Sequence, residues 1–114
     1  MDDGPLHDGM NLVFKSLADP TRRAILDALF EEPRTTGQLA ALFPDVTRYA
    51  VMKHLKILEE AGLVSVRREG RTRWNTLNPV PLRQMYRRWV GKYMEFWSDA
   101  GLNLKELAEG EAGA

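Results

Sequence analysis

The fold is decided by residues 47–63, which read TRYAVMKHLKILEEAGL. At about 100° per residue, the apolar side chains of this run fall within one narrow arc: Val51, Leu55 and Leu58. Tyr49, Lys53 and Lys56 lie on the opposite side, with Met52 at its flank. The run therefore predicts an amphipathic helix that packs on a core and presents a basic outer face.

The ends of this helix are specified as well. Thr47 can cap the free amides of the first turn. Gly62 suits the left-handed position that follows a helix, and Leu63 can then contact Leu58 as in a Schellman cap. We therefore expect the helix to begin at about Thr47 and to end at residues 61–63.

A shorter helix precedes it after a tight turn. Thr35 and Gln38 have the spacing of a capping box, and Pro44 stops the helix. Its buried face is apolar and consists of Leu39, Leu42 and Phe43. Two short helices joined by a tight turn predict a helix-turn-helix.

Two further helices are predicted upstream. The first covers about residues 8–18, with apolar residues at helical spacing: Met10, Val13, Phe14 and Leu17. Asp19 and Pro20 then mark a break and a restart, because Asp19 can cap a helix and Pro20 suits its first position. The second helix ends near residues 31–33.

Downstream, the apolar pattern changes its period. Residues 63–68 and 72–77 are typical of two strands around a turn at Gly70. Either Glu69–Gly70 or Gly70–Arg71 can hold this turn. A β-hairpin directly after the fourth helix is where the wing of a winged helix-turn-helix belongs.

The expected fold is mainly α with a small β-hairpin: four helices, the hairpin, and a long fifth helix from residues 78–81 to about Leu107. We expect one winged helix-turn-helix domain over residues 8–107. Flexible ends are expected at residues 1–7 and 108–114.

Positive charge is concentrated in the helix-turn-helix and the wing. The chain has 16 basic and 16 acidic residues, but residues 46–76 contain seven basic against three acidic ones. This segment is therefore +4 and the rest of the chain −4, which predicts one basic face.

That face predicts contact with double-stranded DNA, because Lys and Arg reach phosphates and guanine edges. The predicted contacts are Thr47, Arg48, Tyr49, Met52, Lys53, Lys56, Arg67, Arg68, Arg71 and Arg73. Thr47 caps its helix and leaves the positive helix end near a phosphate. The alternative is that these charges form a solvated helix face and a hairpin edge that resists aggregation.

Composition excludes several other classes of protein. Because the chain has no cysteine, disulfides, thiolate metal sites and cysteine nucleophiles are absent. No apolar run approaches the roughly 20 residues of a membrane span, and the acidic start lacks the pattern of a signal peptide. We expect a cytoplasmic protein without a membrane partner. Without a nucleophile–base pairing, a phosphate-binding glycine loop or a metal cluster, we expect neither an enzyme nor a cofactor.

His54 and His7 are the two histidines of the chain. His54 lies at the edge of the core arc, one residue before Leu55. We therefore interpret His54 as a partly buried packing residue rather than a DNA contact. No second strong ligand lies at a suitable spacing for a metal site.

The last helix carries a dense apolar stripe. Its members follow heptad-like steps of four and three residues, widened by Met85 and Trp97: Leu82, Tyr86, Trp89, Tyr93, Phe96 and Ala100. Such a stripe can close the core of one domain, or line a pocket for an apolar effector. We favour a homodimer interface, because the earlier helices already supply faces for a small core. The expected interface consists of Met10, Val13, Phe14, Leu17, Leu82, Tyr86, Trp89, Tyr93, Phe96 and Trp97.

Two ordered motifs resemble ArsR/SmtB-family repressors: residues 14–26, FKSLADPTRRAIL, and residues 51–64, VMKHLKILEEAGLV. The resemblance covers about residues 10–107. It implies a homodimeric winged helix whose first and last helices form the interface. It also implies an operator near the protein's own promoter and release by an effector.

The chain departs from the metal-sensing pattern of that family. Metal sensors have cysteines near the third helix, or His and Asp pairs on the last helix, and this chain has neither. Glu95, Asp99 and Glu106 alone make a poor transition-metal site. The resemblance thus implies the branch that does not sense metal. Tyr49 and Met52 also replace the small polar residues usual on the recognition helix.

Together with the basic face and the apolar stripe, the resemblance implies a homodimeric repressor that binds a palindromic operator of its own gene or of a neighbouring operon. Release is expected through a small-molecule effector that is not a metal, or through titration. The alternative is a winged-helix protein-interaction module without sequence-specific DNA binding, but a protein partner would not need the basic polarisation.

Overall fold

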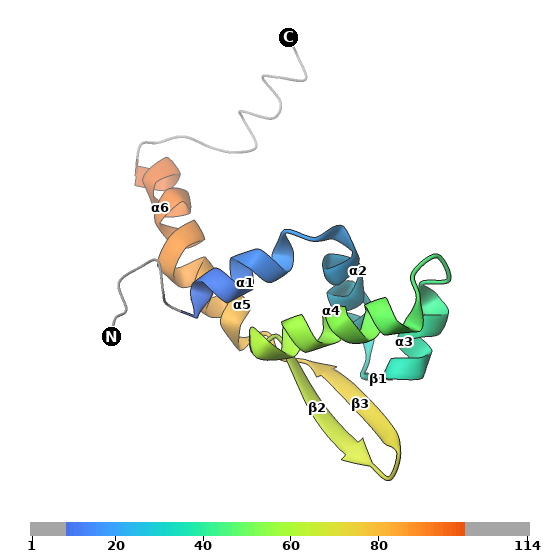
Figure 1. Ribbon diagram of the computed structural model, residues 1–114. Coiled ribbons are helices and arrows are strands. Elements are labelled where there is room, and N and C mark those ends of the chain that lie inside the picture. Colours follow the sequence, from blue (N-terminus) through green and yellow to red (C-terminus); the bar gives the residue numbers. More distant parts are fainter. Residues whose placement is uncertain (1–8, 100–114) are drawn as a thin grey trace. The chain divides into compact units, whose positions relative to one another are not determined.

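The computed structural model describes residues 9–99 (Figure 1). The chain divides into two compact units, Met1–Leu82 and Arg83–Ala114. This boundary falls inside the single domain that the sequence predicts over residues 8–107. The predicted ends, and the last helix between residue 100 and Leu107, lie outside the described residues.

The first unit contains the predicted helices and hairpin in the predicted order. Its elements are α1 (Met10–Leu17), α2 (Pro20–Glu31), β1 (Arg34–Thr35), α3 (Thr36–Leu42), α4 (Arg48–Glu60), β2 (Val64–Glu69), β3 (Thr72–Leu77) and the start of α5 (Val80–Met85). The hairpin projects from the C-terminal end of α4, as a wing does (Figure 1). The winged helix-turn-helix is confirmed.

The core of this unit lies beneath α4. Val51, Leu55 and Leu58 are all at most 1% exposed, as the helical arc predicts. They are buried together with residues of the other helices, of the turn after α4 and of β2: Val13, Ile25, Leu26, Leu29, Leu39, Leu63 and Val64. Full burial of each such side chain contributes about 1.5–3 kcal/mol, so packing holds α4 in place.

Side-chain caps fix where the helices begin. The Asp19 carboxylate accepts a bond from the Arg22 N–H at 3.0 Å, and Pro20 is the first residue of α2. Thr35 and Gln38 form both bonds of the capping box before α3, each 3.0 Å long. These bonds satisfy amides that have no partner within the helix.

The predicted Schellman cap ends α4. The Leu63 N–H donates to the Leu58 carbonyl, and the Gly62 N–H donates to the Glu59 carbonyl, both at 2.9 Å. Gly62 has a φ of +78°, which glycine adopts without a Cβ clash. The chain therefore turns sharply from α4 into β2.

The sheet has three antiparallel strands in the order β1-β3-β2. Glu69 pairs with Thr72, so Gly70–Arg71 is the turn. Gly70 has a φ of +61° and no other residue in the described hairpin has a positive φ, which fits a type II′ turn. The register thus decides between the two turns that the sequence left open.

Strand β1 was not predicted. It consists of two polar residues, Arg34 and Thr35, which are too few to show a period. Fully buried Asn75 holds it in place, since its Nδ2 donates to the Arg34 carbonyl and to Thr36 Oγ1, both at 3.2 Å. The strand joins α3 to the hairpin.

After α5, the second unit contains a π-helical turn, η2 (Tyr86–Val90), followed directly by α6 (Gly91–Asp99). The Gly91 N–H donates to the Tyr86 carbonyl, five residues earlier. The predicted long fifth helix is present over residues 80–99, with a π turn within it that the sequence pattern did not indicate. The heptad steps therefore do not run unbroken along the last helix, because a π turn adds a residue to one turn.

Candidate nucleic-acid interface

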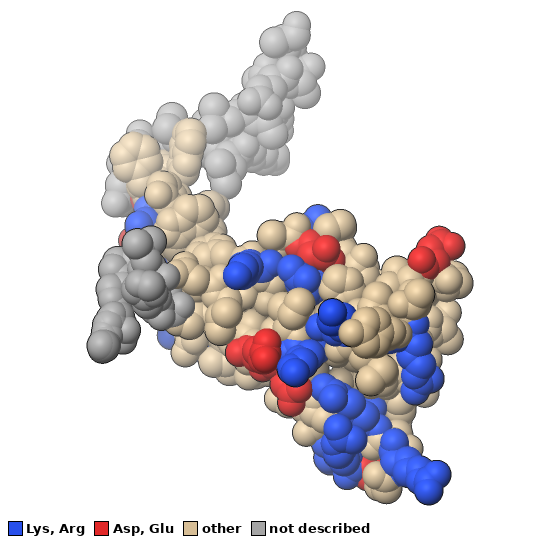
Figure 2. All heavy atoms as spheres, viewed as in Figure 1, with Lys and Arg blue, Asp and Glu red and all other residues tan. Residues whose placement is uncertain are grey.

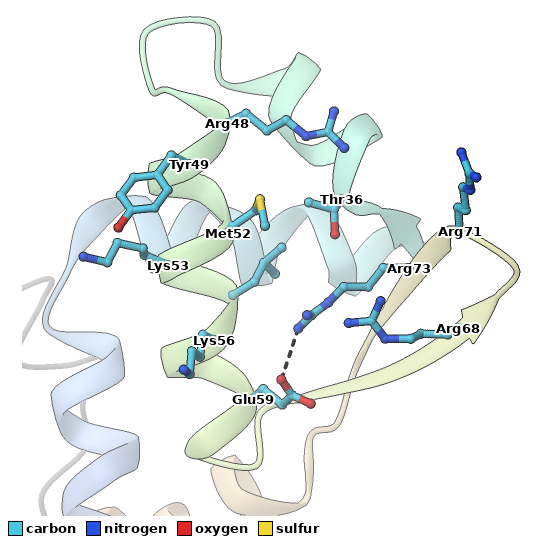
Figure 3. A pocket seen from close by; sticks show the side chains of 11 residues that line it. Thr36, Arg48, Tyr49, Met52, Lys53, Lys56, Glu59, Arg68, Arg71 and Arg73 are labelled. Carbon is cyan, nitrogen blue, oxygen red and sulfur yellow. Dashed lines mark hydrogen bonds and ion pairs between the residues drawn. The ribbon is translucent and has the colours of Figure 1, made fainter.

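A groove of about 610 Å³ lies between α4 and the hairpin (Figure 3). Eleven residues line it: Thr36, Arg48, Tyr49, Met52, Lys53, Leu55, Lys56, Glu59, Arg68, Arg71 and Arg73. Six of them are Lys or Arg, and Glu59 is the one carboxylate among the described residues of the lining. The groove therefore carries a strong positive potential that suits a polyanion.

The outer face of α4 forms one wall of the groove. Tyr49 is 68% exposed and Met52 is 51% exposed, so both side chains are available to a ligand. Lys53 Nζ lies 5.2 Å from the centre of the Tyr49 ring, a cation–π distance. This wall thus presents an aromatic ring and ammonium groups together.

Thr47 has a positioning role at the start of this wall. Its Oγ1 accepts a bond from the Ala50 N–H at 3.0 Å, as the predicted cap requires. Arg48 follows in the first turn of α4, and its Nη1 lies 3.7 Å from the point where a Cβ on Gly37 would stand. The Arg48 side chain therefore extends from α4 toward α3 (Figure 3).

The hairpin forms the opposite wall with three arginines. Arg68 and Arg73 are direct partners in the ladder between β2 and β3, and Arg71 lies in the turn. Arg73 Nη2 donates to Glu59 Oε1 at 3.1 Å, which joins the hairpin to the last turn of α4. The fourth wing arginine, Arg67, does not line the groove, and its Nη1 lies 3.6 Å from Glu69 Oε2.

Figure 2 shows that Lys and Arg side chains gather over the hairpin and along α4. The structure thus brings eight of the ten predicted DNA contacts to one groove, all except Thr47 and Arg67. Sequence reasoning missed Thr36 and Glu59. Glu59 follows Lys56 by three residues, so helical spacing could have placed both on one face.

His54 lies outside the groove lining and is half-buried, as predicted for a packing residue. Its Nδ1 lies 3.4 Å from Arg22 Nη1 and 3.9 Å from Asp19 Oδ2. The bond from the Arg22 N–H lowers the pKa of Asp19, against an opposing effect of burial, and the charges of His54 and Arg22 lower it further.

Aromatic side chains are exposed on the second unit. Tyr86, Trp89, Tyr93 and Phe96 are between 46% and 63% exposed. The rings of Trp89 and Tyr93 meet edge to face with centroids 5.3 Å apart. These four residues, called the aromatic surface below, belong to the predicted dimer interface.

The predicted interface residues of α1 differ in how far their side chains are exposed. Val13 is 3% exposed and packs in the core of its own unit. Met10 and Leu17 are half-buried, and Phe14 is 37% exposed. In the second unit, Trp97 is half-buried, as is Leu82 at the end of the first unit. Val13 therefore has little surface to offer a second copy.

Within residues 9–99, no three His, Cys, Asp or Glu side chains group closely enough to hold a metal ion. Over the same residues, no helix has the length and apolar character that crossing a membrane requires.

A model of the helix-turn-helix domain matches residues 17–67. The HTH-type transcriptional regulator YuzN of Bacillus subtilis is 35% identical over 91 residues, which cover 75% of this chain and 99% of that protein. The transcriptional repressor SdpR of Bacillus subtilis is 40% identical over 73 residues, which cover 64% and 80% respectively. A crystal structure of an ArsR family transcriptional regulator matches with a TM-score of 0.72 and 34% identity, over 80% of this chain and 98% of that one.

Proposed function

The chain belongs to the ArsR family of helix-turn-helix transcriptional regulators, and on this premise we propose that it represses transcription by binding a palindromic operator as a homodimer. Its relatives are transcriptional regulators, in agreement with the expectation that the chain is not an enzyme. We propose the cytoplasm as its place of action and its own gene or a neighbouring operon as its target.

The basic groove between α4 and the hairpin carries this proposal. An α-helix fits the major groove of DNA, and α4 has the exposed Tyr49, Met52, Lys53 and Lys56 on the side that would face the bases. Tyr49 and Met52 offer apolar contact to thymine methyl groups, and the lysines reach guanine edges or phosphates. Arg48 extends to the flanking phosphates.

The hairpin arginines complete the proposed contact. Arg71 is exposed in the turn and would enter the adjacent minor groove, where a narrow groove attracts arginine. Arg68 lies on the groove wall and would reach a phosphate. Arg67 lies off the groove and contributes at longer range.

We propose that a second copy of the chain covers the aromatic surface of the second unit. Exposed Tyr, Trp and Phe side chains of this density are typical of protein interfaces. The half-buried and exposed residues of α1, Met10, Phe14 and Leu17, would take part in the same association. Two recognition helices would then read half-sites about one helical turn apart.

Release from DNA is proposed to occur through an effector that is not a metal, or through titration of the repressor. The absence of cysteine and the presence of only two histidines support this proposal, because thiolates and imidazoles are the ligands that transition metals prefer. An apolar small molecule bound near Trp89 and Tyr93 would change tryptophan fluorescence as the DNA is released.

Fluorescence anisotropy with DNA upstream of the gene, and with a scrambled duplex of equal length, tests the proposal. We expect binding in the nanomolar range at physiological salt, with at least about 1,000-fold preference for the operator, and a steep loss of affinity as salt rises. A chain that binds both duplexes equally at every salt concentration is instead the winged-helix interaction module.

A further inference from the structure

The hairpin contains a like-charge pair at the groove. Arg68 and Arg73 stand directly opposite each other in the ladder, and both line the groove. Like charges at directly opposed positions destabilise a sheet. A counter-charge on the protein or on a ligand would relieve this repulsion.

Glu59 supplies this counter-charge to one of the two arginines. Arg73 Nη2 lies 3.1 Å from Glu59 Oε1, and the Arg73 side chain is 26% exposed against 45% for Glu59. Arg73 Nε is buried and has no hydrogen-bond partner among the described residues. The Arg73 guanidinium is thus held beside α4, and no described carboxylate is within ion-pair distance of Arg68 or Arg71.

We propose that Glu59 and Arg73 form a strut that sets the spacing between the recognition helix and the wing, so that Arg73 positions the wing rather than contacting phosphate. This inference rests on the proposed function and divides the groove arginines by role. Arg68 contacts a phosphate and Arg71 enters the minor groove, while Arg73 holds the hairpin strand opposite Arg68 in place.

The strut has a consequence for discrimination between DNA sequences. The Glu59 carboxylate repels phosphate and neutralises one arginine, so it weakens non-specific binding, which is electrostatic. A fixed spacing between α4 and the hairpin favours the operator, because both grooves must be reached at once. The pair therefore raises the ratio of operator affinity to non-specific affinity.

Two sets of variants, each made in residues 1–114, test the strut. The probes are the tightest duplex selected from a random double-stranded library, and poly(dI–dC) as non-specific DNA. Glu59→Gln should tighten non-specific binding about 2- to 5-fold without tightening operator binding, so that discrimination falls. Simple electrostatics instead predicts that Glu59→Gln tightens both equally, and that result would overturn the inference.

The salt dependence separates positioning from phosphate contact. Arg68→Ala should reduce the slope of log affinity against log salt by about 1, whereas Arg73→Ala should weaken operator binding and leave the slope unchanged. An equal loss of slope in both variants assigns Arg73 to phosphate and refutes the strut. The double variant Glu59→Arg with Arg73→Glu exchanges the two charges and keeps the net charge. It should therefore restore part of the discrimination that Glu59→Gln loses, and a double variant without such recovery counts against the inference.

The proposed function and the strut can be tested separately. If the wild-type chain selects no duplex from the library, the proposed function is wrong. Only the strut is wrong if the chain selects a duplex but the variants give the opposing results. Those results are that Arg73→Ala loses as much salt slope as Arg68→Ala does, and that Glu59→Gln tightens both duplexes equally. Thermal unfolding of each variant shows that the readout comes from folded protein.

Discussion

Arg22 of α2 reaches His54 of α4, with Nη1 3.4 Å from Nδ1. The same guanidinium donates from Nε to the Ser16 carbonyl at 2.9 Å and from Nη2 to the Lys15 carbonyl at 3.0 Å. These carbonyls belong to the last turn of α1, where the Lys15 carbonyl also accepts a bond from the Ala18 N–H at 3.3 Å. One side chain therefore joins the end of α1, the start of α2 and the recognition helix.

Arg22→Ala should lower the free energy of unfolding by about 2 kcal/mol, because a charged donor loses a partly buried bond to the Ser16 carbonyl and an exposed one to the Lys15 carbonyl. Arg22→Lys should recover little of this, since one ammonium group cannot span three acceptors. Urea unfolding at fixed protein concentration measures the change. Arg23→Ala, which removes one exposed bond to the Leu17 carbonyl, is the matched control, and an equal loss in both variants would refute the joint role.

Asp19 makes stability depend on pH. Its pKa in the folded chain is below the usual value of 3.8, so the carboxylate stabilises the fold above that pH, and the contribution disappears as pH falls through the lowered pKa. Asp19→Asn keeps a capping acceptor but loses the charge. Between about pH 5 and pH 2, the stability difference between wild type and Asp19→Asn should shrink as the pH falls below about 4. Thermal unfolding across this range checks it, and parallel curves would contradict it.

Gly62→Ala should destabilise the fold by about 1–2 kcal/mol, because an L side chain is strained at positive φ. Space is not the obstacle, since the added Cβ would meet Pro81 Cγ at an ordinary 3.5 Å. Gly37→Ala is the control: its Cβ would also make an ordinary contact, at 3.7 Å, and its helical backbone should make the change stabilising by about 0.5 kcal/mol. Chemical unfolding of both variants should therefore give opposite signs.

The elements of the first unit could be predicted from sequence because residues within or next to each element specify it. Thr35, Thr47 and Gly62 specify helix ends through their own side chains or their own φ, so their roles can be read without the fold. The arc of Val51 and Leu55 likewise depends only on helical geometry.

The features that sequence reasoning missed depend on contacts between distant residues. Strand β1 exists because Asn75, 41 positions later, binds the Arg34 carbonyl. The role of Glu59 depends on Arg73 across the groove, 14 positions away. The π turn had one sign in the sequence, the glycine at position 91. A Cβ at this position would lie only 3.1 Å from the Tyr86 carbonyl oxygen.

Lys53→Ala and Lys56→Ala should each weaken operator binding about 5- to 50-fold while leaving the thermal transition in place, because both lysines are exposed and line the groove. Lys15→Ala, an exposed lysine of α1 that does not line the groove, should bind as wild type does. Anisotropy titrations measure affinity, and circular dichroism measures folding. Loss of the thermal transition in a groove variant would place that lysine in a structural role.

Phe96→Ala should weaken the proposed dimer, with a dissociation constant at least about 10-fold higher, because exposed aromatic side chains supply much of the energy of an interface. Sedimentation velocity over a range of concentrations measures the shift. Ser98→Ala, an exposed polar change on the same helix, is the control and should leave the dimer intact.

A comparison with Tyr49→Ala separates assembly from recognition. Tyr49 is also exposed, at 68%, but it lies on α4 in the groove, so its loss should weaken DNA binding and leave the dimer unchanged. Phe96→Ala should keep the affinity for an isolated half-site and lose the added affinity of a second half-site, because that gain requires two linked recognition helices. If Phe96→Ala remains a dimer and Tyr49→Ala does not, the two surfaces have been assigned the wrong way round.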